Sequence, residues 1–280
     1  SSCGSCGNRC GGSCGAYSNF GNPCAPCNPY CYGSVEALYI EPDGVGRAYG
    51  RDFRVDVFDA EIGGRSTFGS VPDCVHGSEA PFVGPFDWDG SAFAADPGFG
   101  LDTHLVPGLP VAPADLSAFS NADFQTLSYR PRFWSVEANT TLVGWNMAKL
   151  LAGFRYMSYE ERLVYYSQNV NQAGLLGVQT ENNLIGLQVG MDLLYPICRN
   201  AYTDFRSRAG GFINLAESDV ILDNAGTRVL RWSPDDTDIA GMFELSTGLR
   251  YELGQMLSVR AGVELWYLAG VAKEIGRAHV

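Results

Sequence analysis

The 280-residue sequence predicts an all-β protein, an antiparallel up-and-down transmembrane β-barrel of about 8–12 strands. Three features predict this fold class. Long segments in the second half of the chain alternate apolar with polar residues, and short connections between these segments alternate with longer ones. In addition, no apolar run reaches the roughly 18 residues that a membrane-spanning helix needs.

The clearest alternation runs from residue 243 to residue 267. Odd positions are almost wholly apolar on both sides of a turn near Gly254, whereas even positions are polar or small. A period of two indicates β-strands with one apolar and one polar face. Strands in soluble domains usually have about 5–6 residues, whereas a transmembrane strand needs about 9–11 and points its apolar face at lipid. The length of these faces therefore favours a membrane barrel.

The chain divides into a Cys/Gly-rich tail (1–33), the barrel (34–273) and a short end segment (274–280). The first strand is expected at 34–41. Two long loops are expected at 42–96 and 106–122, with short strands at 53–58 and 97–105. Regular strands are then expected at 123–144, 150–168, 178–195, 202–222, 238–254 and 256–270.

Strand parity makes two geometric predictions. The apolar faces of strands 243–253 and 257–267 must lie on the same side of the sheet, so the turn between them must contain an odd number of residues. The expected turn has either three residues, Gly254-Gln255-Met256, or five. That register places Glu252 opposite Ser258 and Arg250 opposite Arg260. In the hairpin closed by 196–201, Asp192 and Arg206 should share the polar face and form an ion pair.

The polar strand faces also carry charged residues. An Arg or Lys that faced lipid at mid-membrane would cost about 2–4 kcal/mol, so these side chains are expected to point into the lumen. The predicted lumen-facing residues are Glu137, Arg155, Asp192, Arg206, Arg208, Glu244, Arg250, Glu252, Arg260 and Glu264. Their nearly balanced charges fit either a wet, weakly selective pore or a lumen filled by ion pairs. In a barrel of about eight strands, side chains just fill the interior, which favours the filled lumen.

The tail contains seven cysteines among Gly, Ser, Asn and Pro: Cys3, Cys6, Cys10, Cys14, Cys24, Cys27 and Cys31. Two Cys-x2-Cys pairs could bind zinc as paired knuckles. Disulfides are favoured because an exported protein meets an oxidising compartment, and the odd number of cysteines allows a disulfide to an envelope partner. No metal site is assigned firmly.

Composition and motifs argue against several function classes. The net charge of -12 and pI near 4.6 argue against nucleic-acid binding, which requires clustered Lys and Arg. The sequence contains no GxSxG, HExxH or phosphate-binding glycine loop, so no catalysis and no cofactor are expected. The acidic run 235–238 is expected to be a solvated loop rather than a Ca²⁺ site.

Four segments carry a resemblance: GFRYMSYEE (153–161), TENNLIGLQVG (180–190), SRAGGFINLAES (207–218) and LSVRAGVELWYLAGVA (257–272). Together they resemble a bacterial porin-like outer-membrane β-barrel family, the seventh of the numbered β-barrel porin groups. The resemblance implies an exported protein in contact with outer-membrane lipid, with a porin-like or structural and surface role. The alternative is a soluble secreted β-sandwich or barrel that acts as a binding module.

The end segment 274–280 matches the translation of a common short-read sequencing adapter. We therefore expect these residues to be non-native. The similar proteins continue beyond GVA into a further strand, so the barrel is expected to lack its closing strand. In that case strand 256–270 should have one unpaired edge, opposite a gap in front of the first strand.

Overall fold

The computed structural model describes residues 29–41, 61–73, 75–96, 98, 100–101, 111–145, 148–254 and 257–272. These residues form one antiparallel sheet of eleven strands and a 3-10 helix, η1 (Pro113–Phe119). The strands are β1 (Tyr30–Ile40), β2 (Glu61–Val71), β3 (His76–Asp87), β4 (Gly90–Ala95), β5 (Phe124–Trp145), β6 (Ala148–Gln168), β7 (Ala173–Cys198), β8 (Ala201–Asn224), β9 (Thr227–Trp232), β10 (Asp235–Glu252) and β11 (Ser258–Ala269). Within the described residues, no helix is long and apolar enough to cross a membrane.

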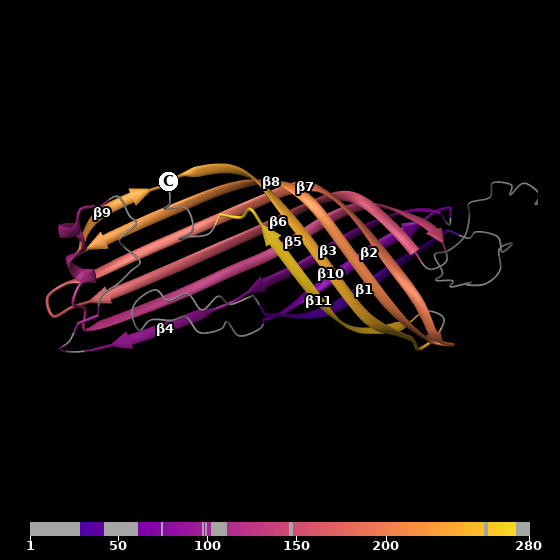
Figure 1. Ribbon diagram of the computed structural model, residues 1–280, viewed down its shortest axis with the longest axis horizontal. Coiled ribbons are helices and arrows are strands. Elements are labelled where there is room, and N and C mark those ends of the chain that lie inside the picture. The colour runs from indigo at the N-terminus through magenta and orange to yellow at the C-terminus, as the bar shows by residue number, and fades with distance from the viewer. Residues whose placement is uncertain are drawn as a thin grey trace, which may run out of the picture.

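Strand pairing makes an up-and-down barrel. Nine strands pair in the order β1-β2-β3-β5-β6-β7-β8-β10-β11, while β4 adds to β5 and β9 adds to β8. Figure 1 shows these strands crossing at a steep tilt in one half of the molecule, where the sheet curls almost into a closed barrel. Along this path, β1 and β11 are the two ends and are not hydrogen-bonded to each other. We call the gap between them the seam.

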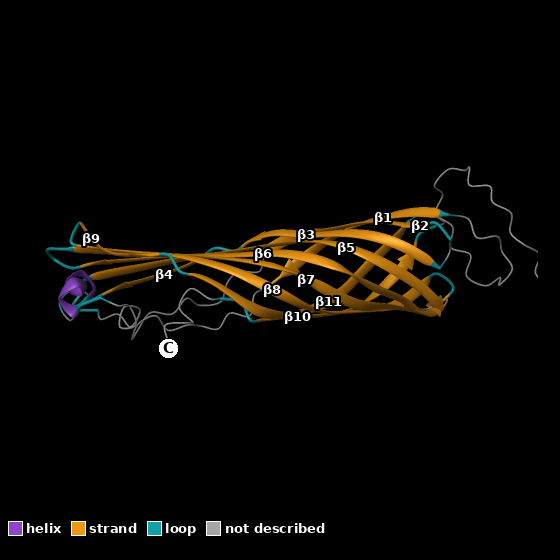
Figure 2. Ribbon diagram, turned by 90° about the horizontal axis from the view of Figure 1, so that it is seen from above, coloured by secondary structure: helices purple, strands orange, loops and turns teal. Residues whose placement is uncertain are grey.

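Beyond the barrel, the long strands continue as a flatter sheet, which we call the extension (Figure 2). It contains β4, β9 and the distal parts of β5 to β8, because β4 pairs with residues 124–129 of β5 and β9 pairs with residues 220–224 of β8. The opposite end of the barrel, the turn end, closes with the connections 72–75, 146–147, 199–200 and 253–257. The two ends therefore differ strongly.

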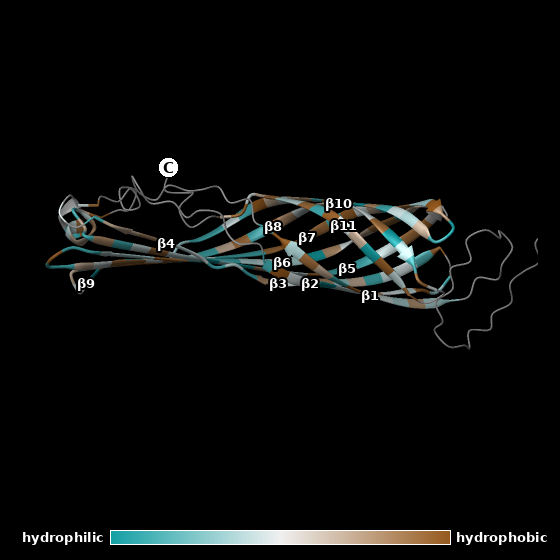
Figure 3. Ribbon diagram, turned by 90° about the horizontal axis from the view of Figure 1, so that it is seen from below, coloured by the Kyte–Doolittle hydropathy of each residue, from teal (hydrophilic) through white to brown (hydrophobic). Residues whose placement is uncertain are grey.

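The outer face of the barrel is apolar. Figure 3 shows hydrophobic positions distributed along the barrel strands. One continuous row of directly paired outward residues crosses eight strands: Val35, Ser66, Phe82, Val136, Tyr156, Ile185, Ile213 and Ile239. In β10 and β11, most apolar residues at odd positions are exposed. The even positions from Ala240 to Ser246 are buried, and Arg260, Glu264, Trp266 and Leu268 of β11 are partly buried.

The inner face is layered. Charged and amide side chains line the half of the barrel near the turn end. Next comes an apolar layer made of Val83, Phe86, Phe133, Met157, Leu184, Phe212, Ala240 and Met242, with Trp88 beside it. On the same face of the extension, η1 packs through Ala118 and Phe119 on a second apolar cluster that includes Leu127, Leu163 and Leu222.

The predicted register of the last hairpin is confirmed. Glu252 lies opposite Ser258, and Arg250 lies opposite Arg260. The pairing of Glu252 with Ser258 leaves an odd number of residues between the strands, as predicted, and the backbone N–H of Leu253 donates to the carbonyl of Leu257 at 2.9 Å within this connection. The six strands predicted after residue 123 all exist, and β7 is longer at both ends than expected.

The predicted loop 42–96 is wrong for residues 61–95, which form β2, β3 and β4. In the predicted loop 106–122, residues 113–119 form η1, and Ala122 bridges to Leu101. The long connection expected after residue 223 contains β9 and the start of β10. The short strand predicted at 53–58, most of the one at 97–105 and the segment 274–280 lie outside the described residues.

Candidate functional site: the charged network in the barrel

Arg155 lies at the centre of the barrel interior. Its side chain is completely buried, and Nη1 lies 3.2 Å from Glu137 Oε1 and 3.1 Å from Glu244 Oε2. Nη2 donates to the hydroxyl of Ser135 at 3.1 Å. The guanidinium also lies over the ring of Trp266, 5.3 Å from its centroid. Three predicted lumen-facing residues, from β5, β6 and β10, therefore meet at one point.

Arg65 on β2 connects this point to the two strands at the seam. Nη2 lies 2.9 Å from Glu244 Oε1, and Nη1 lies 2.6 Å from Glu264 Oε1 on β11. A longer contact of 3.3 Å joins Nη1 to Glu36 Oε2 on β1. Arg65 thus links β1, β10 and β11 from inside the barrel.

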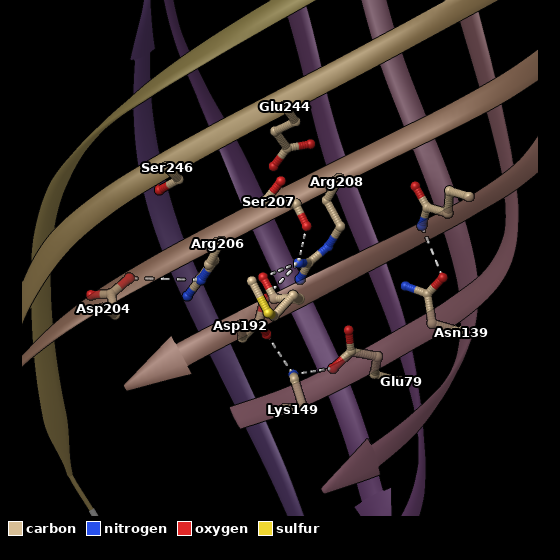
Figure 4. Close-up of polar contacts among 12 residues, drawn as sticks. Glu79, Asn139, Lys149, Asp192, Asp204, Arg206, Ser207, Arg208, Glu244 and Ser246 are labelled. Atoms are coloured by element: carbon tan, nitrogen blue, oxygen red, sulfur yellow. Dashed lines mark hydrogen bonds and ion pairs between the residues drawn. The ribbon is translucent and has the colours of Figure 1, made fainter. Parts of the chain in front are cut away.

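A second group lies nearer the turn end and is drawn in Figure 4. Lys149 Nζ lies 2.7 Å from Glu79 Oε2 and 2.8 Å from Asp192 Oδ2, and Arg208 Nη1 lies 2.5 Å from Asp192 Oδ1. The hydroxyl of Tyr32 donates to Glu79 at 2.8 Å. Two acids and two bases from four strands are paired here.

A third group lies beside the seam. Arg206 Nη2 lies 2.9 Å from Glu36 Oε1, and Arg260 Nε lies 2.8 Å from Asp204 Oδ2. Arg206 also lies 3.9 Å from Asp204. Because Glu36 contacts both Arg206 and Arg65, the first and third groups are parts of one network.

The ion pair predicted between Asp192 and Arg206 is wrong, although the two residues are direct cross-strand partners as expected. Asp192 binds Lys149 and Arg208, and Arg206 binds Glu36 across the lumen. In a narrow barrel, the inward side chains of distant strands meet. A charged side chain can therefore form its ion pair with a residue on a distant strand instead of with its direct cross-strand partner.

Two predicted residues form no ion pair with the other described residues. Arg250 is partly buried beside Arg260, and its buried Nε has no hydrogen-bond partner in the described part of the chain. Glu252 lies partly exposed near the turn end, where its backbone N–H donates to the carbonyl of Asn200 at 2.8 Å.

Neutral amides complete the interior. Gln188 donates to Glu137 at 2.6 Å and to Asn139 at 2.8 Å. Beyond the apolar layer, the buried Asn182 both donates to the carbonyl of Ala272 at 2.9 Å and accepts from its backbone N–H at 2.8 Å. Asn214 donates to Gly270 at 3.3 Å. The residues that follow β11 are therefore held across the lumen against β7 and β8.

Sequence reasoning missed five members of the network: Glu36, Arg65, Glu79, Lys149 and Asp204. Asp204 shares the inward parity of Arg208, so parity along the predicted strand 202–222 could have identified it. Lys149 has the parity of Arg155 but lies one residue before the predicted strand 150–168. Arg65 and Glu79 lie on strands that the sequence analysis assigned to a loop.

Outside the barrel wall, the pKa values of two exposed carboxyl groups are lowered. Hydrogen bonds from the backbone N–H and the ring of His76 hold the pKa of Asp73 below its usual value in the turn 72–75. In the extension, the side-chain hydrogen bond from Arg228 likewise lowers the pKa of Asp223.

Six of the seven tail cysteines, Cys3 to Cys27, lie outside the described residues. Cys31 lies exposed at the start of β1, with Sγ 3.8 Å from Ser70 Oγ. In the part of the chain that the structure describes, no group of three His, Cys, Asp or Glu side chains is arranged to hold a metal ion. The disulfide and zinc interpretations of the tail stay predictions.

No protein-family model, curated protein or solved structure matches this chain. Any function proposed for it therefore rests on the geometry of the barrel.

Proposed function

We propose that this chain is a bacterial outer-membrane β-barrel protein whose lumen is closed, with a structural or surface-display role. The observation that carries the proposal is the polarity of the barrel, which is inverted relative to a soluble protein. Its interior holds a continuous network of buried ions around Arg155 and Arg65, whereas its outside is apolar. Soluble proteins rarely expose contiguous apolar patches of more than a few hundred Å².

The outward row makes this concrete. Val35 is 86% exposed and Ile239 is 81% exposed, although both lie within strands. These two residues lie at the two ends of the outward row. The row runs through directly paired outward positions on eight strands, and most of these positions are apolar. Lipid chains would cover such a surface, so that its apolar side chains would not be exposed to water.

The two ends support an outer-membrane orientation. A strand needs about 9–11 residues to cross the hydrocarbon core, and β7 has 26 residues. The extension would therefore stand outside the membrane on the long-loop side, which faces outward in outer-membrane barrels. Tyr30 pairs with Val71, so the chain enters β1 at the turn end. The Cys-rich tail would then be attached on the periplasmic side, where a disulfide to an envelope partner could form.

A closed lumen favours display over conduction. The ion pairs fill the interior near the turn end, and the apolar layer around Phe86, Met157 and Leu184 lies between them and the extension. Ions would have to cross this layer without water. We therefore expect the barrel to support the extension at the surface rather than to act as an open porin.

Folding and conduction test the proposal separately. The denatured protein should fold only when detergent micelles or lipid are added, and its band should shift in gel electrophoresis when the sample is heated. Folding to a soluble monomer in buffer alone would overturn the membrane assignment and favour the secreted binding module. In planar bilayers the folded protein should give no steady open channel, and a stable conductance would overturn the closed lumen.

A further inference from the structure

A row of charged side chains crosses the outer face of the sheet where the barrel passes into the extension. This charged row consists of directly paired residues on six strands: Asp87, Arg132, Glu160, Glu181, Glu217 and Asp235. It lies on the extension side of the apolar outward row. Because Arg or Lys facing hydrocarbon at mid-membrane costs about 2–4 kcal/mol, the charged row marks one boundary of the apolar surface.

The position of the charged row matches the thickness of a membrane. On β8, the outward positions from Phe205 to Leu215 carry no charge, and Glu217 occupies the next outward position. This uncharged stretch has the roughly 9–11 residues that a strand needs to cross the hydrocarbon core. At the proposed membrane location, the charged row therefore lies at the level of the lipid headgroups on the extension side.

Three arginines gather at this level on β5 and β6. Arg130 and Arg162 are direct cross-strand partners, and Arg132 is the next residue of β5 on the same face. All three are exposed on the outer face of the sheet. Like charges directly opposite each other destabilise a sheet, so an anion between Arg130 and Arg162 would relieve their repulsion.

Three acids border the arginines, and their contacts engage only part of each guanidinium. Arg130 Nη2 lies 3.2 Å from Asp89 Oδ2, Arg132 donates to Asp87 through Nε, and Glu160 is the cross-strand partner of Arg132. The two ion pairs are more than half exposed, and exposed pairs contribute only about 0–1 kcal/mol. A guanidinium has five N–H donors, so each arginine can also donate to a phosphate oxygen.

Toward the turn end, the same face becomes aromatic and then apolar. Trp134 follows Arg132 on the outer face of β5, and its ring centroid lies 6.4 Å from that of Phe82 and 5.2 Å from that of Tyr156. Trp and Tyr are enriched at membrane interfaces. Cations, aromatic rings and apolar residues such as Val136 thus follow one another along the strand. A phospholipid has the same order of phosphate, ester linkage and acyl chain.

The rest of the charged row disfavours such a lipid. On β7, β8 and β10 it contains only acids, Glu181, Glu217 and Asp235. These carboxylates would repel a phosphate group. An anionic headgroup is therefore expected on β5 and β6 rather than elsewhere along the row.

We infer that Arg130, Arg132 and Arg162 form a binding site for the phosphate of an anionic phospholipid in the leaflet on the extension side. The guanidinium groups donate to the phosphate oxygens, a contact that is frequently bidentate. The acyl chains lie along Trp134 and the apolar outer face beyond it. The inference rests on the proposed membrane location, because only a barrel in lipid presents this face to a headgroup.

The test uses the full chain folded in dodecyl maltoside micelles, whose headgroup contains no phosphate. Phosphatidic acid and diacylglycerol with the same acyl chains are titrated separately, and native mass spectrometry counts the lipid molecules that the barrel retains. Phosphatidic acid should be retained at about tenfold lower concentration than diacylglycerol, the effect of one charge-assisted hydrogen bond. Inorganic phosphate at the same concentrations should not displace it, because inorganic phosphate has no acyl chains to contact the aromatic and apolar face.

Two double variants locate the site. Arg130→Gln with Arg162→Gln should remove the preference for phosphatidic acid. The matched control is Arg228→Gln with Arg231→Gln, which removes the same charge from exposed positions on β9 and should keep the preference. All four arginines are exposed, so both variants should fold.

Equal retention of the two lipids by the unaltered barrel would overturn the inference. A preference that survives Arg130→Gln with Arg162→Gln, or that the β9 control also loses, would overturn it too. Displacement by inorganic phosphate would assign the arginines to a soluble anion instead of a lipid. A chain that folds in buffer alone would overturn both proposals, whereas a barrel that folds in micelles and retains both lipids equally would overturn only this one.

Discussion

Arg155 is the largest side chain that the described residues bury completely, and its charge is matched locally. Taking a guanidinium out of water carries a penalty of several kcal/mol, which two carboxylates, a hydroxyl and the Trp266 ring offset here. Removing the cation would leave Glu137 and Glu244 buried with one partner fewer each.

We expect Arg155→Ala to lower the free energy of unfolding of the barrel by about 3–5 kcal/mol, because it leaves buried charges uncompensated. Urea titration of the protein in lipid vesicles measures this change. The control is Arg132→Ala, which breaks the exposed pair with Asp87 and should change stability by less than about 1 kcal/mol. Equal losses in the two variants would contradict a buried network.

At the scale of strands, the sequence predicted the elements in which apolar and polar residues alternate regularly, and it missed elements in which this alternation is broken. β5 to β8, β10 and β11 keep their apolar residues at every second position, so their existence and faces could be predicted. β3 contains Pro81 and Pro85, and its register shifts between Val83 and Phe86. That irregularity breaks the period of two, which made β3 look like a loop.

β2 and β9 were missed for other reasons. Gly63 and Gly69 on β2 face inward beneath the rings of Phe86 and Tyr32, so the strand has few large residues of its own. β9 follows a two-residue turn in which Ala225 and Gly226 both have positive φ, 50° and 77°. A hairpin turn of this kind is usually signalled by Asn-Gly or Asp-Gly, and Ala-Gly gives no such signal. The ion-pair partners of the lumen-facing residues depend on how the sheet curls into a barrel, which cannot be predicted from the local sequence pattern of each strand.

Gly63 gives a direct test of the packing in β2. A Cβ at Gly63 would lie 2.3 Å from Phe86 Cε1, whereas one at Gly64 would lie 3.9 Å from the Glu36 carbonyl. Gly63→Ala should therefore destabilise the barrel by about 1–3 kcal/mol through overpacking, and Gly64→Ala should be nearly neutral. Unfolding titrations of the two variants compare them, and a neutral Gly63→Ala would show that Phe86 does not pack there.

The outward row predicts a depth-dependent penalty. Ile213 is flanked by Ile185 and Ile239, so Ile213→Arg should cost about 2–4 kcal/mol if the row lies near the membrane centre. Val170 is 85% exposed in the connection between β6 and β7, and Val170→Arg should have little effect. Unfolding from lipid vesicles is the measurement. A harmless Ile213→Arg would place this row in water.

At the scale of the whole molecule, two different environments follow one another along the same strands. The barrel has a polar inside and an apolar outside, whereas the extension buries an apolar cluster beneath η1. Strands of 21 to 26 residues, such as β6 and β7, pass through both. At the proposed membrane location, the barrel would lie in lipid and hold the extension outside the bilayer.

Fluorescence quenching by lipids brominated on their acyl chains tests the inverted polarity most directly. Trp134 lies outside the barrel, next to Phe82 and Tyr156, whereas Trp266 lies inside, over Arg155. Two single-tryptophan proteins, folded into brominated vesicles, report on these positions. We expect strong quenching of Trp134 and little quenching of Trp266. Equal quenching of both, or no quenching of Trp134, would contradict a barrel whose apolar outer face contacts lipid.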